Sequence, residues 1–571
     1  MDVIECAAIS FSDAEVIQGD GEDGPSSKEI GVPELSPVAE ELNDLLGRIS
    51  SLCTLIEKLG KDFIVENGQY DLTGNMDESV SHELQRYAAT VEVFDNTSDI
   101  SVTNMKTISD GTLFYLVHMQ GMMKPLFPNL HTLCLTQTTT SRFPHLVLFT
   151  SPSLARVELS DNDQTSNLPV VLFLQRQRRY HSVTEMILHR IRLSSGAFKT
   201  ISTLHQLKHL ELRDVSGSSD ASDLKRLFDI PHLSYLDLGI QSMEYTPTFQ
   251  PSKAAFSAAR KEDRRVHESL ETFIFEGDLT ALLDLRDNIV SARLKTLAIR
   301  LPGIADFHRR TTINVVETVL KKKPGFIKMQ EHQVINTKTV TNPLWVLLTD
   351  IVSYLSGSLQ SLALLLHDRA IHGASAKGIY YDLYRLRALT SLHLKGFPLP
   401  KEFTWTPSRY YWRRSEPPWP KIRYLRFELG LGSSSGGSFY DPNLPFEVLD
   451  YVAKSYPNIE FFEGPVGLPT FPMLHDDNLE EGIHHYDLDA FKSIKINPSL
   501  TTLSIGTYNS KSRCEVDIRV AEYLTLYLQQ MFPNLQKVIP HPLYEGKFWN
   551  RVEALLQMHR KIREMNQTPS Q

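Results

Sequence analysis

Cysteine is scarce in this sequence. Four of the 571 residues are cysteines, Cys6, Cys53, Cys134 and Cys514, and no two of them form a Cys-X-X-Cys pair. A disulfide framework in a small secreted domain is dense in cysteine, and a thiolate zinc site needs cysteine pairs at short spacing. The sequence therefore predicts neither feature, and its cysteine content fits a reducing compartment.

Long apolar runs and a leader sequence are also missing. The longest runs, such as the one at 343–355, are shorter than the roughly 20 residues of a membrane span. That run also contains Asp350. The first 24 residues carry acidic side chains where an export or organelle leader would carry basic ones. We therefore expect a cytoplasmic or nuclear protein that does not enter a membrane.

Two common catalytic signatures are absent. The sequence contains neither the phosphate-binding Gly-X-X-X-X-Gly-Lys-Ser/Thr motif nor the metalloprotease motif His-Glu-X-X-His. The glycine-rich segment at 19–24 is acidic and follows no predicted strand, so its backbone is a poor cradle for phosphate. We predict a non-enzymatic chain with no catalytic residues, no metal site and no cofactor.

Basic charge is not in excess. The net charge is −9 and the pI is about 6.1, which argues against a surface that neutralises nucleic-acid phosphates. Apolar residues make up 41% of the chain, enough for a folded core. The balance disfavours a nucleic acid as the partner.

The N-terminal part divides into three segments. Residues 1–35 are rich in Gly, Asp, Glu, Ser and Pro, which predicts an acidic disordered N-terminus. The segment 36–60 has apolar residues at steps of three and four, which predicts an amphipathic helix. This helix either pairs as a short coiled coil or docks on the main body. Residues 61–125 are expected to form a lead-in or cap. The apolar positions of the helix are Leu42, Leu45, Ile49, Leu52, Ile56 and Leu59.

A short phrase recurs from about residue 126. An apolar residue is followed by a second one at +3 and a third at +5, as in Leu130, Leu133 and Leu135. The phrase starts at 130, 154, 183, 207, 233, 270, 294, 359, 389, 422 and 500, with degenerate copies at 459 and 535. The long interval before 359 leaves room for a divergent unit. Helix-like stretches lie between the phrases, at 170–179, 222–230, 280–290, 311–323, 445–456 and 516–532.

Units of one strand and one helix are too small to bury both faces alone and must stack on their neighbours. The sequence therefore predicts an irregular, leucine-rich-repeat-like α/β solenoid over 126–540. Its parallel sheet should line the concave face, with helices outside. Residues 541–571 should form a C-terminal capping helix and tail.

The phrase at 127–135 and the segment 145–159 resemble the repeats of the F-box and leucine-rich-repeat-like protein families of mushroom-forming fungi. Residues 84–94 resemble the segment that leads into those repeats, and the helix at 36–59 is similar to their coiled-coil-like first helix. The resemblance implies a substrate receptor that binds a Skp-type adaptor and a cullin of a ubiquitin ligase. The Leu-Pro-X-Glu-Ile type phrase that opens an F-box is not recognisable in this sequence.

The concave face provides the candidate binding site. Side chains alternate along a strand, so positions +2, +4 and +6 of each phrase should point away from the leucine core. Mixed charges with aromatics and arginine are typical of protein-recognition surfaces. We predict that a protein partner binds to Arg156, Glu158, His189, His209, Glu211, Arg213, Tyr235, Asp237, His393, Lys395, Tyr424, Arg426 and Glu428.

Two insertions support an alternative function. The stretch 475–489 gathers histidines and aspartates that suit a divalent metal, although a solvated polar loop has the same composition. The stretch 408–420 alternates arginines with aromatics that could stack on bases, or could anchor a loop to the solenoid. The alternative is therefore a metal-dependent enzyme or nucleic-acid binder that uses the insertions at 400–420 and 470–490.

Overall fold

A computed structural model of the chain provides the structure. It describes residues 47–59, 63–66, 69–72, 78–96, 107–120, 125–137, 143–161, 168–240, 242–246, 268–289, 293–301, 355–366, 382–397, 419–428, 448–466, 495–505, 518–540 and 546–567, together with Leu348, Val352, Tyr380 and Pro417.

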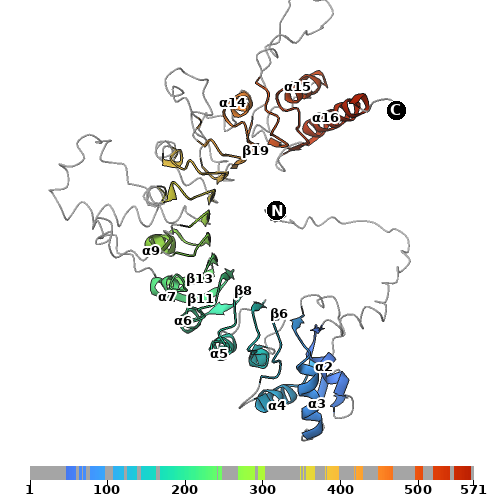
Figure 1. Cartoon of the computed structure of the whole chain (residues 1–571), viewed down its shortest axis with the longest axis vertical. Coiled ribbons are helices and arrows are strands. Elements are labelled where there is room, and N and C mark those ends of the chain that lie inside the picture. Colours follow the sequence, from blue (N-terminus) through green and yellow to red (C-terminus); the bar gives the residue numbers. More distant parts are fainter. Residues whose placement is uncertain are drawn as a thin grey trace, which may run out of the picture. The chain divides into compact units, whose positions relative to one another are not determined.

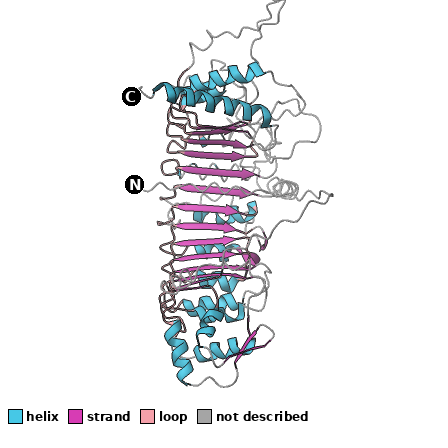
Figure 2. Cartoon of the chain, turned by 90° about the vertical axis from the view of Figure 1, so that its right-hand side faces the viewer, coloured by secondary structure: helices cyan, strands magenta, loops and turns pink. Residues whose placement is uncertain are grey.

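One long sheet runs through the described residues. It has 15 strands, all of which pair in parallel, and their order in the sheet follows their order in the chain. Figure 2 shows the strands stacked side by side and pointing the same way. The strands are β1 (Arg48–Ile49), β4 (Val93–Asp95), β6 (Thr132–Gln137), β7 (Arg156–Asp161), β8 (Glu185–His189), β10 (His209–Arg213), β12 (Tyr235–Gly239), β14 (Thr272–Glu276), β15 (Thr296–Leu301), β16 (Ser361–Leu366), β17 (Ser391–Lys395), β18 (Tyr424–Glu428), β19 (Phe461–Gly464), β20 (Thr502–Ile505) and β21 (Lys537–Pro540).

The recurring phrase explains the strands. Every one of its thirteen copies, degenerate ones included, forms a strand that begins two residues after the first apolar position. In β7, Val157 and Leu159 are fully buried, while their neighbours Arg156, Glu158 and Ser160 are partly exposed. The alternation places one apolar row on the helix side of the sheet, where the stacked rows form a continuous core. The prediction of an α/β solenoid built on a parallel sheet is confirmed.

Helices connect the strands and cover one side of the sheet, where α5, α6, α7 and α9 lie in a row (Figure 1). Each helix predicted between the phrases that falls on described residues is present. The helices are α2 (Leu52–Leu59), α3 (Glu78–Ala88), α4 (Asp110–Gln120), α5 (Leu168–Gln177), α6 (Ser195–Ile201), α7 (Ala221–Leu227), α9 (Leu279–Ile289), α14 (Val448–Ser455), α15 (Ile518–Met531) and α16 (Gly546–Gln567), with a 3₁₀ helix at Phe143–Phe149. The predicted helix at 311–323 lies outside the described residues.

Two small sheets stand beside the main one. Strands β9 (Arg192–Leu193), β11 (Ser216–Asp220) and β13 (Ser242–Thr246) pair in parallel. Near the N-terminal end, β2 (Phe63–Glu66) and β3 (Gln69–Leu72) form an antiparallel hairpin, and β5 (Thr107–Ile108) pairs with β3 in parallel.

The chain turns sharply after several strands. Arg190, Asp214 and Gly396 follow β8, β10 and β17 directly, and all three have a positive φ of 56°, 51° and 77°. At Gly396 a Cβ atom would lie 2.4 Å from the carbonyl oxygen of Leu366, so no side chain fits. Arg190 lies between β8 and β9, and Asp214 lies between β10 and β11, so both mark points where the chain leaves the main sheet.

The N-terminal end differs from the prediction. The sheet begins at Arg48, well before residue 126, because β1 and β4 continue it. The predicted helix at 36–60 is wrong at Arg48–Ile49, which form β1, and is helical over Leu52–Leu59. Its first part and the segment 1–35 lie outside the described residues. Strand β15 pairs directly with β16, so the long interval between them adds no strand to the main sheet at that point.

None of the described helices is long and apolar enough to cross a membrane.

Candidate functional site

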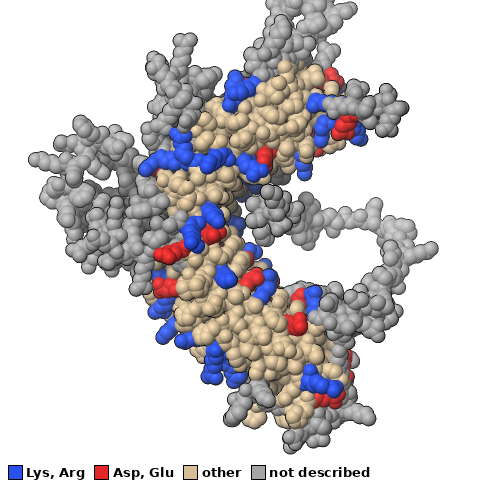
Figure 3. Space-filling view, viewed as in Figure 1, with Lys and Arg blue, Asp and Glu red and all other residues tan. Residues whose placement is uncertain are grey.

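The side of the main sheet opposite α5, α6, α7 and α9 is the candidate site, and we call it the open face. All thirteen predicted binding residues lie on β7, β8, β10, β12, β17 and β18, at positions that alternate with the core residues. Whether they bind a partner stays a prediction. Figure 3 shows Lys and Arg side chains beside Asp and Glu side chains along the described part of the chain.

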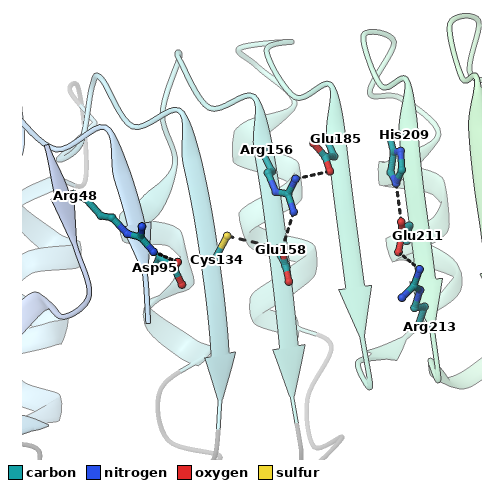
Figure 4. Close-up of polar contacts among 9 residues, drawn as sticks. All are labelled: Arg48, Asp95, Cys134, Arg156, Glu158, Glu185, His209, Glu211 and Arg213. Atoms are coloured by element: carbon teal, nitrogen blue, oxygen red, sulfur yellow. Dashed lines mark hydrogen bonds and ion pairs between the residues drawn. The ribbon is translucent and has the colours of Figure 1, made fainter. Parts of the chain in front are cut away.

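Eight residues on β7, β8, β10 and β12 lie close together because their strands pair in register. We call these residues the first ion-pair cluster. Arg156 holds two carboxylates, because its Nη1 lies 2.8 Å from Oε1 of Glu185 and its Nη2 lies 3.0 Å from Oε2 of Glu158 (Figure 4). Arg213 lies 2.7 Å from Oε2 of Glu211. The cluster comprises Arg156, Glu158, Glu185, His209, Glu211, Arg213, Tyr235 and Asp237.

The rings of His209 and Tyr235 and the carboxylate of Asp237 complete this cluster. The His209 ring stacks on Tyr235 with centroids 4.0 Å apart, and Nε2 of His209 lies 2.8 Å from Oε1 of Glu211. Nε of Arg213 lies 3.4 Å from Oδ2 of Asp237. Parallel register makes these contacts possible, since His209 pairs with Tyr235 and Glu211 pairs with Asp237 across neighbouring strands.

The carboxylates of this cluster differ in their electrostatic environment. Burial raises the pKa of Asp237 to about 6, with Arg213 opposing the shift and Glu211 adding to it. Burial also acts to raise the pKa of Glu211, but the hydrogen bond with His209 and the charge of Arg213 outweigh it and hold this pKa below the usual range. Burial and the neighbouring Glu158 raise the pKa of the Cys134 thiol to about 11. Cys134 is therefore a neutral thiol at physiological pH rather than a nucleophile.

A second ion-pair cluster lies on β17, β18 and β19, and it consists of His393, Lys395, Arg426, Glu428 and Glu463. Glu428 is its centre: one oxygen lies 2.9 Å from Nε2 of His393 and 2.6 Å from Nη2 of Arg426, and the other lies 3.2 Å from Nζ of Lys395. Nε of Arg426 lies 3.0 Å from Oε2 of Glu463.

The pKa values of the two glutamates of this cluster are shifted in opposite directions. Burial disfavours the charge on Glu428, but the hydrogen bond and charge of His393, together with Arg426 and Lys395, lower its pKa to about 2. Glu463 shares Arg426 with Glu428, so burial prevails and raises its pKa to about 7. Burial likewise lowers the pKa of His393, with the bond from Glu428 opposing the shift.

Between the two clusters one row of the open face carries uncharged side chains, beside an ion pair in which Nη1 of Arg300 on β15 lies 3.1 Å from Oε2 of Glu276 on β14. Ile274, Ala298 and Ala363 are register partners on β14, β15 and β16, and each is partly exposed. We call these three residues the neutral strip. The row beside it is also uncharged and consists of Thr272, Thr296, Ser361 and Ser391. The middle of the open face therefore carries an apolar row, which lies between a row of small hydroxyl side chains and the ion pair of Glu276 and Arg300.

This arrangement suits recognition of a surface. The cations of both clusters are paired with carboxylates, and among the described residues no three metal-binding side chains gather at one point. The histidines and aspartates of 475–489 lie outside the described residues, as does most of 408–420. Trp419 is described: it is fully buried and donates from Nε1 to the carbonyl of Leu383 at 2.9 Å. For Trp419, the interpretation as an anchor is confirmed.

Several residues of the open face were missed by reasoning from sequence. Glu185 and Glu463 belong to the ion-pair clusters, and Ala298 and Ala363 form the strip between them. Their positions within the recurring phrase could have identified all four, because each occupies position +2 or +4. The search for charge overlooked the alanines, and lateral pairing was needed to place the glutamates.

The chain is similar to solved structures, but no family model and no curated protein matches it. Among solved structures the chain is similar to a plant peptide hormone receptor, RGFR1, in complex with RGF2, with a TM-score of 0.26 and 9% identity. The match covers 67% of this chain and 48% of that chain, so this chain spans about half of the receptor's length. The class of the protein, an α/β solenoid with one long parallel sheet, therefore follows from the strand order itself.

Proposed function

We propose that this chain is a non-catalytic scaffold that binds another protein across the open face of its sheet. The observation that carries the proposal is the continuous, partly exposed surface of that face, in which a neutral strip lies between two ion-pair clusters. Buried apolar contact within a polar rim is the usual plan of a protein interface. The ion pairs fix the long side chains before binding, which lowers the entropic cost of ordering them.

The finer role is that of an F-box-family substrate receptor, with a Skp-type adaptor and a cullin as further partners. Its support is the resemblance of the repeats at 127–159 to that family. In this role the open face holds the substrate, and the N-terminal part recruits the ligase.

The test is affinity purification of the tagged chain from its own cell type, followed by mass spectrometry. The variant Ala298→Arg with Ala363→Arg places two long cations on the neutral strip. Leu172→Arg is the matched control, because Leu172 is an exposed residue of α5 on the helix side. We expect the double variant to lose partners that the control retains. Partners that bind all three chains equally would refute the proposal.

The adaptor and the cullin are scored separately in the same experiment. Their recovery with the wild-type chain and with the double variant would support ligase recruitment away from the open face. Their reproducible absence beside other partners would reject the ligase role and leave the scaffold role standing.

A further inference from the structure

The charges of the open face are unequal at its two ends. The first ion-pair cluster holds four carboxylates, on Glu158, Glu185, Glu211 and Asp237, against the guanidinium groups of Arg156 and Arg213. Negative charge is therefore in excess there. In the second cluster Lys395 and Arg426 balance Glu428 and Glu463 when both glutamates are ionised, which for Glu463 requires a pH above its pKa of about 7.

The uncompensated charge is accessible at one edge of the first cluster. The side chains of Glu158 and Glu185 are 35% and 29% exposed, whereas those of Glu211 and Asp237 are 11% and 7% exposed. A cation from a partner would therefore reach the carboxylates of β7 and β8 first. A carboxylate from a partner would instead meet like charge there, and would find the cations of the second cluster already paired.

Resting on the proposed function, we infer that the partner is a protein segment that crosses the strands and combines a cation with an apolar side chain. A lysine or arginine of that segment contacts Glu158 and Glu185, and an apolar side chain lies on the neutral strip. The charge complementarity sets the direction: the basic end lies over β7 and β8, and the apolar end lies over β14 to β16.

The strand spacing fixes how far apart the two side chains are. Neighbouring strands lie about 4.8 Å apart. Strand β8 is three strands from β14 and four from β15 in the sheet order. The cation and the apolar side chain are therefore about 14 to 19 Å apart, which an extended segment spans in roughly four to six residues at about 3.4 Å each.

The experiment is selection of random dodecapeptides displayed on phage against the immobilised full-length chain. We expect enriched peptides to carry Lys or Arg about four to six residues from a large apolar residue. Enrichment of acidic peptides, or of peptides without a cation, would overturn the inference. One enriched peptide is then synthesised, and its affinity is measured by fluorescence anisotropy against the wild-type chain and its variants.

Three variants separate the contributions. Glu158→Gln with Glu185→Gln should weaken binding about threefold to tenfold at low salt, and the loss should shrink as salt is added. Ala298→Gln should weaken binding at least about tenfold, because it puts a polar side chain on the apolar contact. Thr502→Gln on β20 is the matched control and should leave binding unchanged.

The pattern of effects separates failure of the inference from failure of the proposed function. If Ala298→Gln weakens binding and the glutamine pair does not, the charge assignment is wrong while the open face remains the binding surface. If Ala298→Gln weakens the binding of none of the selected peptides, both the inference and the proposed function are refuted.

Discussion

Replacing Glu463 with glutamine should stabilise the folded chain above pH 7, even though the change removes one partner of an ion pair. Glu463 is nearly buried on β19, and its charged partner is Nε of Arg426, 3.0 Å away. Arg426 also serves Glu428, which has Lys395 and the ring of His393 beside it. The shared arginine does not compensate Glu463 for the water that it loses on folding.

The magnitude follows from the pKa. Burial raises the pKa of Glu463 from 4.5 to about 7. A folded-state pKa above the unfolded value means that the contribution of the group is complete below pH 4.5 and is lost as the pH rises through 7. A shift of roughly 2.5 corresponds to about 3 kcal/mol. Glutamine resembles the protonated acid and does not titrate, so the variant keeps this contribution at high pH.

The measurement is urea unfolding of both proteins at pH 5 and pH 8, with hydrogen exchange of β18 to β20 as the local probe. We expect the two chains to be equally stable at pH 5 to within about 1 kcal/mol, and the variant to be about 3 kcal/mol more stable at pH 8. Glu460→Gln is the control, since its exposed ion pair with Arg423 should contribute less than about 1 kcal/mol. Equal stability of wild type and Glu463→Gln at pH 8, or a loss at that pH, would refute the reasoning.

Three further substitutions test the turns and the core by thermal denaturation. Gly396→Ala should cost about 2 kcal/mol or more, because φ is positive there and a neighbouring carbonyl fills the space of the Cβ; Gly357→Ala, with nothing within 4 Å, should cost much less, and similar losses would contradict the explanation. Asn497→Leu should cost about 2 to 4 kcal/mol, since its buried amide donates to the Tyr456 carbonyl at 2.9 Å; a neutral result would mean that the freed groups find other partners. Trp549→Ala should cost about 3 to 5 kcal/mol and speed hydrogen exchange in β21, and unchanged exchange there would show that α16 does not protect the last strand.

The sequence was sufficient to predict most strands because one local rule produces them. An apolar residue at 0, +3 and +5 supplies both the turn into the strand and its two buried side chains. The rule missed β4, where Val91 and Phe94 fit but Asn96 occupies the third position. Asn96 bonds both backbone groups of Thr136, with its Nδ2 3.1 Å from the carbonyl oxygen and its Oδ1 2.7 Å from the amide nitrogen. Asn96 thus takes the place of the expected leucine, because its side chain forms hydrogen bonds with the backbone of the neighbouring strand β6.

Strand β1 was missed for a different reason. Ile49 belongs to a series of apolar residues at helical spacing, and a strand of two residues is too short to show its own alternation. Pairing with Val93 and Phe94 outweighs the local helical preference there.

The open face was predictable as a set of positions but not as a site. Alternation within each phrase identifies which side chains leave the core, as it did for Arg426 and Glu428. It does not tell which residue lies beside which, because partners such as Ala298 and Ala363 are 65 positions apart in the chain. The register of the folded sheet supplies that information, and the charge imbalance emerges with it.

The C-terminal end of the sheet limits how far the array can extend. Strand β21 contains Pro540, which has no backbone N–H to donate to a further strand. Helix α16 packs beside β21, and its Arg560 and Arg563 donate to the carbonyls of Gln536 and Pro533. An open parallel edge would be a template on which another chain could add strands and grow into a filament. The proline removes one backbone donor from this edge and the two arginines occupy two carbonyls just before β21, so strand addition at this end is disfavoured.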